Sequence, residues 1–361
     1  MAAYGANDLQ GGSVGKGAAP SHLRAPTLYA ALDLGTNNCR LLVAHPTRHS
    51  FRIVDAFSRI VRLGEGLSKS GLLSEAAITR TIEALKVCRA KLDARHVSRA
   101  RLIATEACRQ AENGGEFLAR VRVETGLDLE IVDRETEAQL AAAGCAALAD
   151  DDATAILIFD IGGGSSEIVW LCRHDQKDAR HASMDARHTG AAMRERVKLW
   201  TSLPLGVVTL AEKFGGEDVS CATFDAMVAH VREAMQDFIA RTQAETRCAQ
   251  FHLLGTSGTV TTIAGVHLGL ARYDRRQVDG LWMSDEDVTA AMARLRAMPY
   301  ADRAANGCIG RERADLVLAG CAIFEAIRQA FPASRVRIAD RGLREGILMQ
   351  LMSADRVWGR G

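Results

Sequence analysis

The sequence has no cysteine spacing of the kind that forms a disulfide framework or a zinc site. Its nine cysteines are odd in number, lie far apart between Cys39 and Cys321, and never read Cys-x-x-Cys. Small disulfide-bonded domains and zinc modules both need closer, paired cysteines. We therefore expect the cysteines to be reduced thiols and the protein to be cytoplasmic.

Long apolar runs are also missing, and the net charge is close to zero. No apolar stretch approaches the ~20 residues of a transmembrane helix. Residues 1–26 are rich in Gly, Ala and Ser and lack the apolar segment of a signal peptide, which predicts a disordered tail. Lys and Arg total 45 against 44 Asp and Glu, a net charge of +1. This balance provides no long-range attraction to nucleic acid or to an anionic membrane, so neither is expected as a partner.

What the sequence does contain is an internal repeat. Leu28–Val43 reads LYAALDLGTNNCRLLV and Ala155–Trp170 reads AILIFDIGGGSSEIVW, so that Asp33 matches Asp160 at an offset of 127 residues. In each copy an apolar run meets Asp-x-Gly, small polar residues and a second apolar run, a pattern that predicts two strands joined by a tight turn. A chain of 361 residues exceeds one hydrophobic core, and the repeat predicts two similar domains.

Helical and strand-like segments alternate along the rest of the chain, which favours an α/β fold. Ser74 is a candidate N-cap for the first of these helices, and the second is expected to break near Asn113-Gly114. A polar stretch from His174 to Met193 predicts a solvated loop. The expected helices are 74–92, 107–125, 135–148, 221–242, 285–298 and 313–330, and the expected strands are 100–105, 129–133, 251–254 and 336–338.

The Asp-x-Gly turns give the first indication of chemistry. Their backbone N–H groups can surround a phosphate, because glycine has no Cβ in the way, and the adjacent carboxylate can hold Mg²⁺. A third segment, Gly255–Thr262, follows a strand and opens a helix, whose positive N-terminus suits an anion. Taken singly, the glycine run is also typical of a flexible turn, and the third segment of an ordinary capped helix.

Seven motifs lie along the chain: Asp33–Arg40 (DLGTNNCR), Arg62–Leu67 (RLGEGL), Ala104–Arg109 (ATEACR), Asp160–Ser165 (DIGGGS), Ser202–Gly206 (SLPLG), Gly255–Thr259 (GTSGT) and Asp340–Gly346 (DRGLREG). In their identity and order these motifs resemble those of the exopolyphosphatase and guanosine pentaphosphate phosphohydrolase family. The resemblance covers roughly residues 27–350.

The resemblance implies a duplicated actin-like, Hsp70-like and sugar-kinase-like (ribonuclease H-like) fold, in which two α/β domains surround a phosphate-binding cleft. We expect domain I at residues 27–133, completed by a C-terminal helix at about 342–361, and domain II at residues 134–341. Arg344 and Glu345 are expected to be structural, at a tight turn into that helix. The family also implies a homodimer, and this chain is expected to be its short, two-domain form.

The family's catalytic carboxylate lies in a Gly-x-Glu-Glu-Ala segment ahead of the second phosphate loop. Aligned on Glu-Ala, the resemblance assigns this role to Glu137, with Thr136 in place of the first Glu. A water that attacks a terminal phosphorus needs such a base or orienting acceptor in line with the leaving oxygen. From the residues alone, Glu137 could instead be an exposed helix residue paired with Arg134.

The remaining assignments concern phosphate and metal. Arg40 and Arg109 are expected to contact phosphate oxygens through their guanidinium forks. Asp33, Asp160 and Glu137 are expected to hold Mg²⁺, with Mn²⁺ as an alternative. The other phosphate-binding candidates are Gly35, Thr36, Asn37, Asn38, Gly162, Gly163, Gly164, Ser165, Ser257, Gly258 and Thr259.

Two other patterns carry less weight. Three histidines recur every seven residues, but no carboxylate or cysteine lies at metal-ligand spacing, so a loop is favoured over a metal site. A basic run is typical of a solvated helix face and loop, the alternative being a track that extends the site for a long polyanion. The histidines are His174, His181 and His188, and the basic run is Arg89, Lys91, Arg95, Arg99 and Arg101.

The leading hypothesis is a Mg²⁺-dependent hydrolase that removes terminal orthophosphate from inorganic polyphosphate, with shorter chains favoured. The alternative is hydrolysis of the 5′-phosphate of guanosine pentaphosphate, or an enzyme that acts on both and responds to guanosine tetraphosphate. A further hypothesis is an ATP-dependent kinase or a filament protein of the same fold. The carboxylate ahead of the second phosphate loop, Glu137, argues against this class. The last hypothesis is a nucleotide-binding regulator that has lost catalysis. The presence of Glu137, Asp33 and Asp160 argues against it.

Overall fold

The computed structural model describes residues 27–150, 152–172, 196–248 and 250–358. The expected tail at residues 1–26 and the expected loop from His174 to Met193 lie outside this part of the chain. Within it, none of the helices combines the length and the apolar character needed to cross a membrane. The eight cysteines whose surroundings are described form no disulfide, which agrees with the expected reduced thiols.

The repeated segments form the two hairpins that the pattern predicts. The hairpins are β1–β2 (Tyr29–Leu34 and Asn38–Pro46) and β6–β7 (Ala155–Ile161 and Ser166–Cys172), each antiparallel. In both turns the glycine of Asp-x-Gly donates its N–H across the turn. Gly35 donates to the Asn38 carbonyl and Gly162 to the Ser165 carbonyl, each over 2.9 Å.

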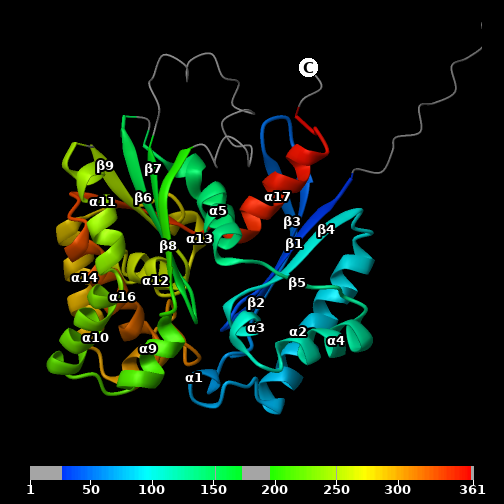
Figure 1. Cartoon of the computed structure of the whole chain (residues 1–361), viewed down its shortest axis with the longest axis horizontal. Helices are drawn as coiled ribbons and strands as arrows, with labels where there is room; N and C mark the ends of the chain where they lie inside the picture. Colours follow the sequence, from blue (N-terminus) through cyan, green and yellow to red (C-terminus); the bar gives the residue numbers. More distant parts are fainter. Residues whose placement is uncertain (1–26, 151, 173–195, 249, 359–361) are drawn as a thin grey trace, which may run out of the picture.

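Each hairpin continues into a sheet, and the two sheets share one strand order. The other strands are β3 (Phe51–Ile60), β4 (Arg99–Ala104), β5 (Glu130–Ile131), β8 (Val197–Leu203), β9 (Phe251–Thr256), β10 (Trp282–Ser284) and β11 (Arg335–Ala339). The first sheet runs β3-β2-β1-β4-β5, and the second runs β8-β7-β6-β9-β11 with β10 added at its edge. This duplicated topology confirms the two similar units, which lie side by side in Figure 1.

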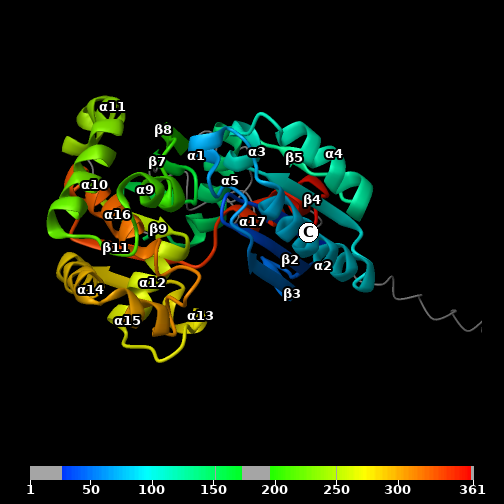
Figure 2. The ribbon, with the colours of Figure 1, turned by 90° about the horizontal axis from the view of Figure 1, so that it is seen from below.

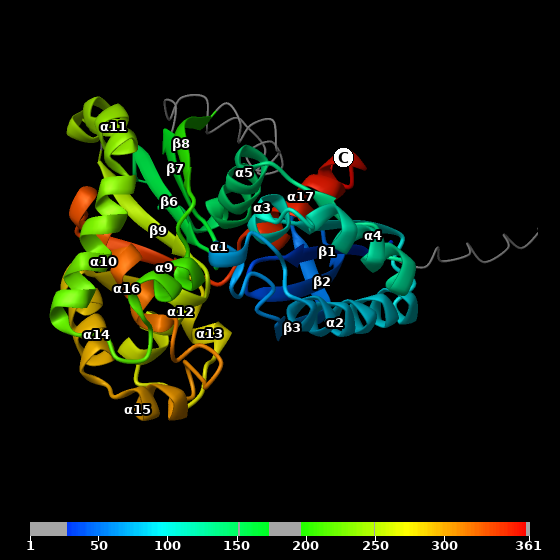
Figure 3. The same cartoon turned by 60° about the horizontal axis from the view of Figure 1, so that its bottom comes forward.

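Helices pack on both sheets, most of them on the outer faces and two between the sheets. They are α1 (Leu67–Ser70), α2 (Glu75–Ala94), α3 (Glu106–Gln110), α4 (Gly114–Thr125), α5 (Arg134–Cys145), α9 (Val207–Phe214), α10 (Cys221–Ala234), α11 (Gln236–Cys248), α12 (Gly258–His267), α13 (Arg275–Val278), α14 (Asp285–Ala297), α15 (Tyr300–Ala305), α16 (Val317–Ala330) and α17 (Leu343–Ala354). As predicted, Ser74 caps α2, its hydroxyl accepting the Ala77 N–H at 3.3 Å. Figures 2 and 3 show α2 and α4 on one outer flank of the molecule and α10, α14 and α16 on the other.

Two central helices, α5 and α17, exchange sides between the sheets (Figure 1). α5 follows β5 of the first unit but packs on β6, β7 and β8, whereas α17 follows β11 of the second unit and packs on β1 and β2. The two helices meet at glycines: a Cβ on Gly144 would lie 1.9 Å from the Gly342 carbonyl oxygen, and one on Gly346 would lie 2.0 Å from that of Leu140. We therefore propose that domain II begins at residue 134 and that α17 completes domain I.

The elements differ from the expected ones at several points. The helix expected at 221–242 is two helices, α10 and α11, which separate at the buried Met235. The helix expected at 313–330 begins only at Val317. Strands β3 and β8 were not expected, because most of their residues are only partly buried and polar side chains interrupt the apolar alternation.

The substitution Gly144→Ala tests the close crossing of α5 and α17. The added methyl would meet a backbone carbonyl of the packed partner, so the helices would have to move apart. We expect the free energy of unfolding, measured by urea denaturation, to fall by about 1–3 kcal/mol. Gly115→Ala in α4, where a Cβ would have no atom within 4 Å, is the matched control and should be neutral or stabilising. Equal stabilities of the two variants would contradict the crossing.

Candidate active site

Five of the seven sequence motifs contribute residues to one cavity between the two domains. The cavity has a volume of about 120 Å³, and its walls come from both hairpins, from α5 and from the start of α12. Of the expected site residues, all but Arg109 line it. They are Asp33, Gly35, Thr36, Asn37, Asn38, Arg40, Glu137, Asp160, Gly162, Gly163, Gly164, Ser165, Ser257, Gly258 and Thr259.

The two hairpin turns touch each other across the domain junction. Thr36 and Asn37 of the first turn are buried and lie against the glycines of the second turn. A Cβ on Gly163 would lie 3.0 Å from the Thr36 Cβ, and one on Gly164 would lie 2.6 Å from the Thr36 Oγ1. Glycine therefore allows both backbones to face the same small space.

The start of α9 holds the second turn from behind. Val207 and Val208 donate their N–H groups to the carbonyls of Gly162 and Gly163, over 3.0 and 2.8 Å. Gly206 approaches so closely that a Cβ there would lie 2.3 Å from the Gly163 carbonyl carbon and oxygen. Gly206 of the SLPLG motif and the first residues of α9 thus fix the carbonyl side of the turn.

The third wall is the start of α12. Ser257 has φ of 101°, a conformation that non-glycine residues rarely adopt, and its hydroxyl accepts the Thr259 N–H at 3.4 Å. Gly258 and Thr259 line the cavity at the positive end of a ten-residue helix. Arg313 lines the same wall. Strained backbone of this kind persists where surrounding structure enforces it, often at functional sites, and the helix start suits an anion.

Five carboxyl groups line the cavity, those of Asp33, Glu106, Glu137, Asp160 and Glu167. Burial raises the pKa of Asp33, and burial together with Asp33 raises the pKa of Asp160 to about 6; Arg40 opposes both shifts. Burial together with Asp160 raises the pKa of Glu167 to about 7. Burial together with Glu167 raises the pKa of Glu137 well above its usual range. Each carboxyl disfavours ionisation of the next, so a cation would be stabilised here.

Glu137 lies in the first turn of α5. Asp133 caps this helix, its carboxylate accepting a backbone N–H at 2.7 Å. Glu137 is 9% exposed and accepts a hydrogen bond from Arg109 Nη2 at 3.0 Å. Arg134, its partner in the alternative interpretation, instead donates to Glu106 at 2.7 Å. The interpretation of Glu137 as an exposed residue paired with Arg134 is therefore wrong.

Arg109 is engaged by protein groups on every side. Its Nη1 donates to the Val132 carbonyl at 2.5 Å, its Nε donates to Glu106 at 3.0 Å, and its Nη2 bonds both Glu106 and Glu137. The expected role of Arg109 was direct contact with phosphate. In the structure its guanidinium holds Glu106, one helical turn earlier, and Glu137. Its contact with phosphate stays a prediction.

Glu167 and Arg344 belong to the site but were not predicted there. In the second hairpin Glu167 lies opposite Asp160, as Arg40 lies opposite Asp33 in the first. The repeat offset of 127 residues that relates the two aspartates also relates Arg40 to Glu167, which is the signal that could have found it. Arg344 lowers the pKa of Asp33 and Asp160, so its charge contributes to the site.

The basic run in α2 and β4 gives no support to a polyanion track. Each of its five side chains forms an ion pair with a neighbouring carboxylate, which neutralises its charge locally. The pairs are Arg89–Asp93, Lys91–Asp55, Arg95–Asp55, Arg99–Asp355 and Arg101–Glu130.

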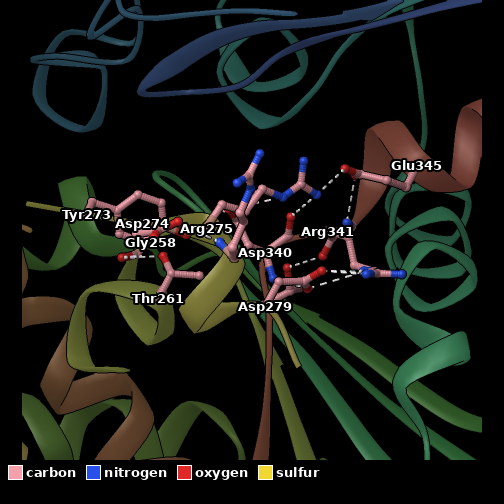
Figure 4. Close-up of polar contacts among 12 residues, drawn as sticks. Gly258, Thr261, Tyr273, Asp274, Arg275, Asp279, Asp340, Arg341 and Glu345 are labelled. Carbon is pink, nitrogen blue, oxygen red and sulfur yellow. Dashed lines mark hydrogen bonds and ion pairs between the residues drawn. The ribbon is translucent and has the colours of Figure 1, made fainter. Parts of the chain in front are cut away.

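A polar network holds the connection between β11 and α17 (Figure 4). Tyr273 Oη donates to Asp340 Oδ2 at 2.7 Å, and Arg275 Nη2 donates to the Asp340 carbonyl at 2.5 Å and to Glu345 at 3.2 Å. The other oxygen of Glu345 accepts the Gly342 N–H at 2.9 Å and caps α17. Glu345 therefore has the structural role expected of it, at the crossing from one domain to the other.

The carboxylates fit a Mg²⁺ ion only in part. Among the described residues, no three His, Cys, Asp or Glu side chains lie close enough to hold a metal by themselves. Asp33, Asp160 and Glu137 do not form the expected three-ligand site, since Arg109 holds the Glu137 carboxylate. Mg²⁺ commonly binds through one or two carboxylates, waters and substrate phosphates. Asp33 and Asp160 fit that smaller donor set.

Comparisons with known proteins agree with these features. The sequence model of the Ppx/GppA phosphatase family matches residues 42–355. Exopolyphosphatase 2 of Mycobacterium tuberculosis is 27% identical over 340 residues, which cover 91% of this chain and 99% of the relative. The guanosine-5′-triphosphate,3′-diphosphate pyrophosphatase of Aeromonas salmonicida is 27% identical over 328 residues, which cover 90% of this chain and 59% of the relative.

Solved structures share the fold. The Ppx/GppA family member of Aquifex aeolicus superimposes with a TM-score of 0.69 at 25% identity, covering 92% of this chain and 99% of its own. The exopolyphosphatase of Cytophaga hutchinsonii superimposes with a TM-score of 0.79 at 22% identity, covering 91% and 98%. The duplicated actin-like fold expected from the sequence is thereby confirmed.

The substitution Gly206→Ala tests whether the second turn binds phosphate. Its methyl would collide with the Gly163 backbone and displace the turn. We expect the Kd for inorganic tripolyphosphate, measured by calorimetry, to rise at least about tenfold, a loss of about 1.4 kcal/mol. Gly115→Ala, far from the cavity, should leave the Kd unchanged. A wild-type Kd in Gly206→Ala would exclude this turn from binding.

Proposed function

The chain belongs to the Ppx/GppA phosphatase family, and we propose that it hydrolyses the terminal phosphoanhydride bond of inorganic polyphosphate and releases orthophosphate. The placement of Glu137 carries this proposal. It is a buried carboxylate, held by Arg109, in a cavity whose other walls are turns rich in backbone N–H groups. A phosphate chain bound by those turns would present its terminal phosphorus to this carboxylate.

Three turns are assigned to phosphate binding: Gly35–Asn38, Gly162–Ser165 and Ser257–Thr259. Arg40 and Arg313 line the same cavity and supply positive charge. Phosphoryl transfer needs little covalent participation by the protein, so positioning and charge neutralisation supply most of the catalysis. The Mycobacterium relative named exopolyphosphatase 2, matched over 99% of its length, supports polyphosphate as the substrate.

Glu137 is assigned the role of general base. Burial and Glu167 raise its pKa, which makes its carboxylate a stronger base than a solvated glutamate, while Arg109 favours the ionised form. The ionised carboxylate accepts a proton from the attacking water as the oxygen of that water bonds to the terminal phosphorus. The electron pair of the broken P–O bond leaves with the shortened chain.

Asp33 and Asp160 are the residues that would hold Mg²⁺ or Mn²⁺ together with phosphate oxygens of the substrate. A bound divalent ion supplies neutralisation of the phosphate charge. The raised pKa of both aspartates supports this assignment, because a bound cation would offset the cost of burying their charges and the repulsion of Asp160 by Asp33.

Guanosine pentaphosphate is a second candidate substrate. The Aeromonas relative is named for activity on this nucleotide, although the chain spans 59% of its length. A cavity of about 390 Å³ adjoins the phosphate cavity, and Asn37 and Leu316 line both. Val208 and Ala211 give it an apolar wall. It offers a place for a nucleoside whose terminal phosphates occupy the turns.

The substitution Glu137→Gln tests the proposed base, because it keeps the shape of the side chain and removes its charge. With Mg²⁺ in excess, we expect kcat for orthophosphate release from tripolyphosphate to fall at least about a hundredfold. The Kd for tripolyphosphate should stay within about threefold, since the turns are intact. Glu135→Gln, an exposed position in the same helix, is the control and should retain wild-type kcat.

Full activity in Glu137→Gln would refute the assignment of the base. The same assay on guanosine pentaphosphate decides between the two substrates through the ratio of their kcat/KM values.

A further inference from the structure

Glu106 is a buried carboxylate at the start of α3 whose contacts exceed what capping that short helix requires. It is 1% exposed, and no part of the proposed mechanism uses it. It accepts hydrogen bonds from Arg109 Nε at 3.0 Å, Arg134 Nη2 at 2.7 Å and Gln110 Nε2 at 2.5 Å, with Arg109 Nη2 as a further donor. Arg134 Nε also donates to it, at 3.3 Å. Five N–H groups therefore converge on one side chain.

These contacts keep Glu106 ionised in a place where burial alone would neutralise it. Burial opposes ionisation, but hydrogen bonds from Arg134 and Arg109 hold its pKa below the usual value. Together with Glu137, the cluster contains two arginines and two glutamates and has no net charge. A buried carboxylate with this set of partners stays in one geometry, because any shift would leave a charge unpaired.

Arg109 transmits this geometry to Glu137. Its guanidinium donates to Glu106 and, over 2.5 Å, to the Val132 carbonyl, and these two contacts fix its position. Its Nη2 also donates to Glu137 Oε2 at 3.0 Å. Its side chain is 18% exposed, so little space remains for another rotamer. The direction in which Glu137 points therefore depends on a residue from a different helix.

The chain connectivity supports the same conclusion. Arg109 and Glu106 lie on α3, which follows β4 of domain I, whereas Arg134 and Glu137 lie on α5, which packs on the sheet of domain II. Glu106 binds one arginine from each helix. It thus sets how α3 and the first turn of α5 lie against each other beside the phosphate cavity.

We propose that Glu106 is a positioning residue for the hydrolysis: by holding Arg109 and Arg134, it fixes the Glu137 carboxylate toward the site of the attacking water. This inference rests on the proposed function, in which Glu137 activates water. Glu106 acts through Arg109, and substrate affinity does not depend on it. A small displacement of a reacting group can cost about a hundredfold in rate, so the expected effect falls on kcat.

The test compares Glu106→Gln with Glu112→Gln, an exposed glutamate that follows α3. With tripolyphosphate and excess Mg²⁺, Glu106→Gln should lower kcat about tenfold to a hundredfold and leave KM within about twofold. Glu112→Gln should match the wild type in both constants. An unchanged kcat in Glu106→Gln, or a change confined to KM, would overturn the proposal.

A second comparison separates positioning from general damage to the fold. In the Glu137→Gln background, adding Glu106→Gln should cause no further loss of kcat, because the group being positioned is already absent. A further loss of the same size as in the wild-type background would show that Glu106 acts independently of Glu137, and would overturn the proposal.

Should Glu106→Gln fail to fold, the variant Arg134→Gln tests the proposal instead. The Arg134 side chain is 40% exposed, and its substitution removes only one of the two cations that contact Glu106. It should lower kcat about threefold to tenfold at constant KM, and an unchanged kcat would overturn the proposal. Failure of the proposed function has a different signature: the wild-type protein itself would then release no orthophosphate from tripolyphosphate or guanosine pentaphosphate.

Discussion

Carboxyl groups buried together in one small cavity repel each other, and the rest of the site serves to offset that repulsion. Burying a charge without a partner costs several kcal/mol, so stability alone would favour apolar residues here. Instead, Arg109 binds Glu137 at 3.0 Å, the Ser202 hydroxyl donates to Glu167 at 2.8 Å, and Arg40 opposes the raised pKa of the neighbouring aspartates. The negative charge left over suits a ligand that brings a divalent cation with its phosphates.

The cavity exists because two copies of one hairpin face each other and the chain crosses between their sheets twice. α5 leaves domain I and packs on the sheet of domain II, while α17 makes the reverse crossing. Glycines let these helices touch backbone to backbone, and the Tyr273–Asp340–Arg275–Glu345 network fixes the second crossing. Because Glu137 lies in the first turn of α5, its distance from the phosphate turns is set by the contact between the two domains.

Features that depend on local pattern could be predicted from the sequence. The paired Asp-x-Gly turns predicted two hairpins and two similar sheets, and Ser74 marked the start of α2. Features that depend on contacts distant in the chain could not. The direction of Arg109 follows from the Glu106 carboxylate beside it and from Glu137 on another helix. β3 escaped prediction because half-exposed strands at a sheet edge carry charged residues among their apolar ones.

The central claim is that the protein directs a water molecule to the terminal phosphorus of a phosphate chain. Hydrolysis of tripolyphosphate in ¹⁸O-labelled water, with the products analysed by mass spectrometry, tests it most directly. Attack at the terminal phosphorus predicts one ¹⁸O atom in each released orthophosphate and none in the pyrophosphate. Label in the pyrophosphate would mean attack at the inner phosphorus and would contradict the account, as would a complete lack of orthophosphate release.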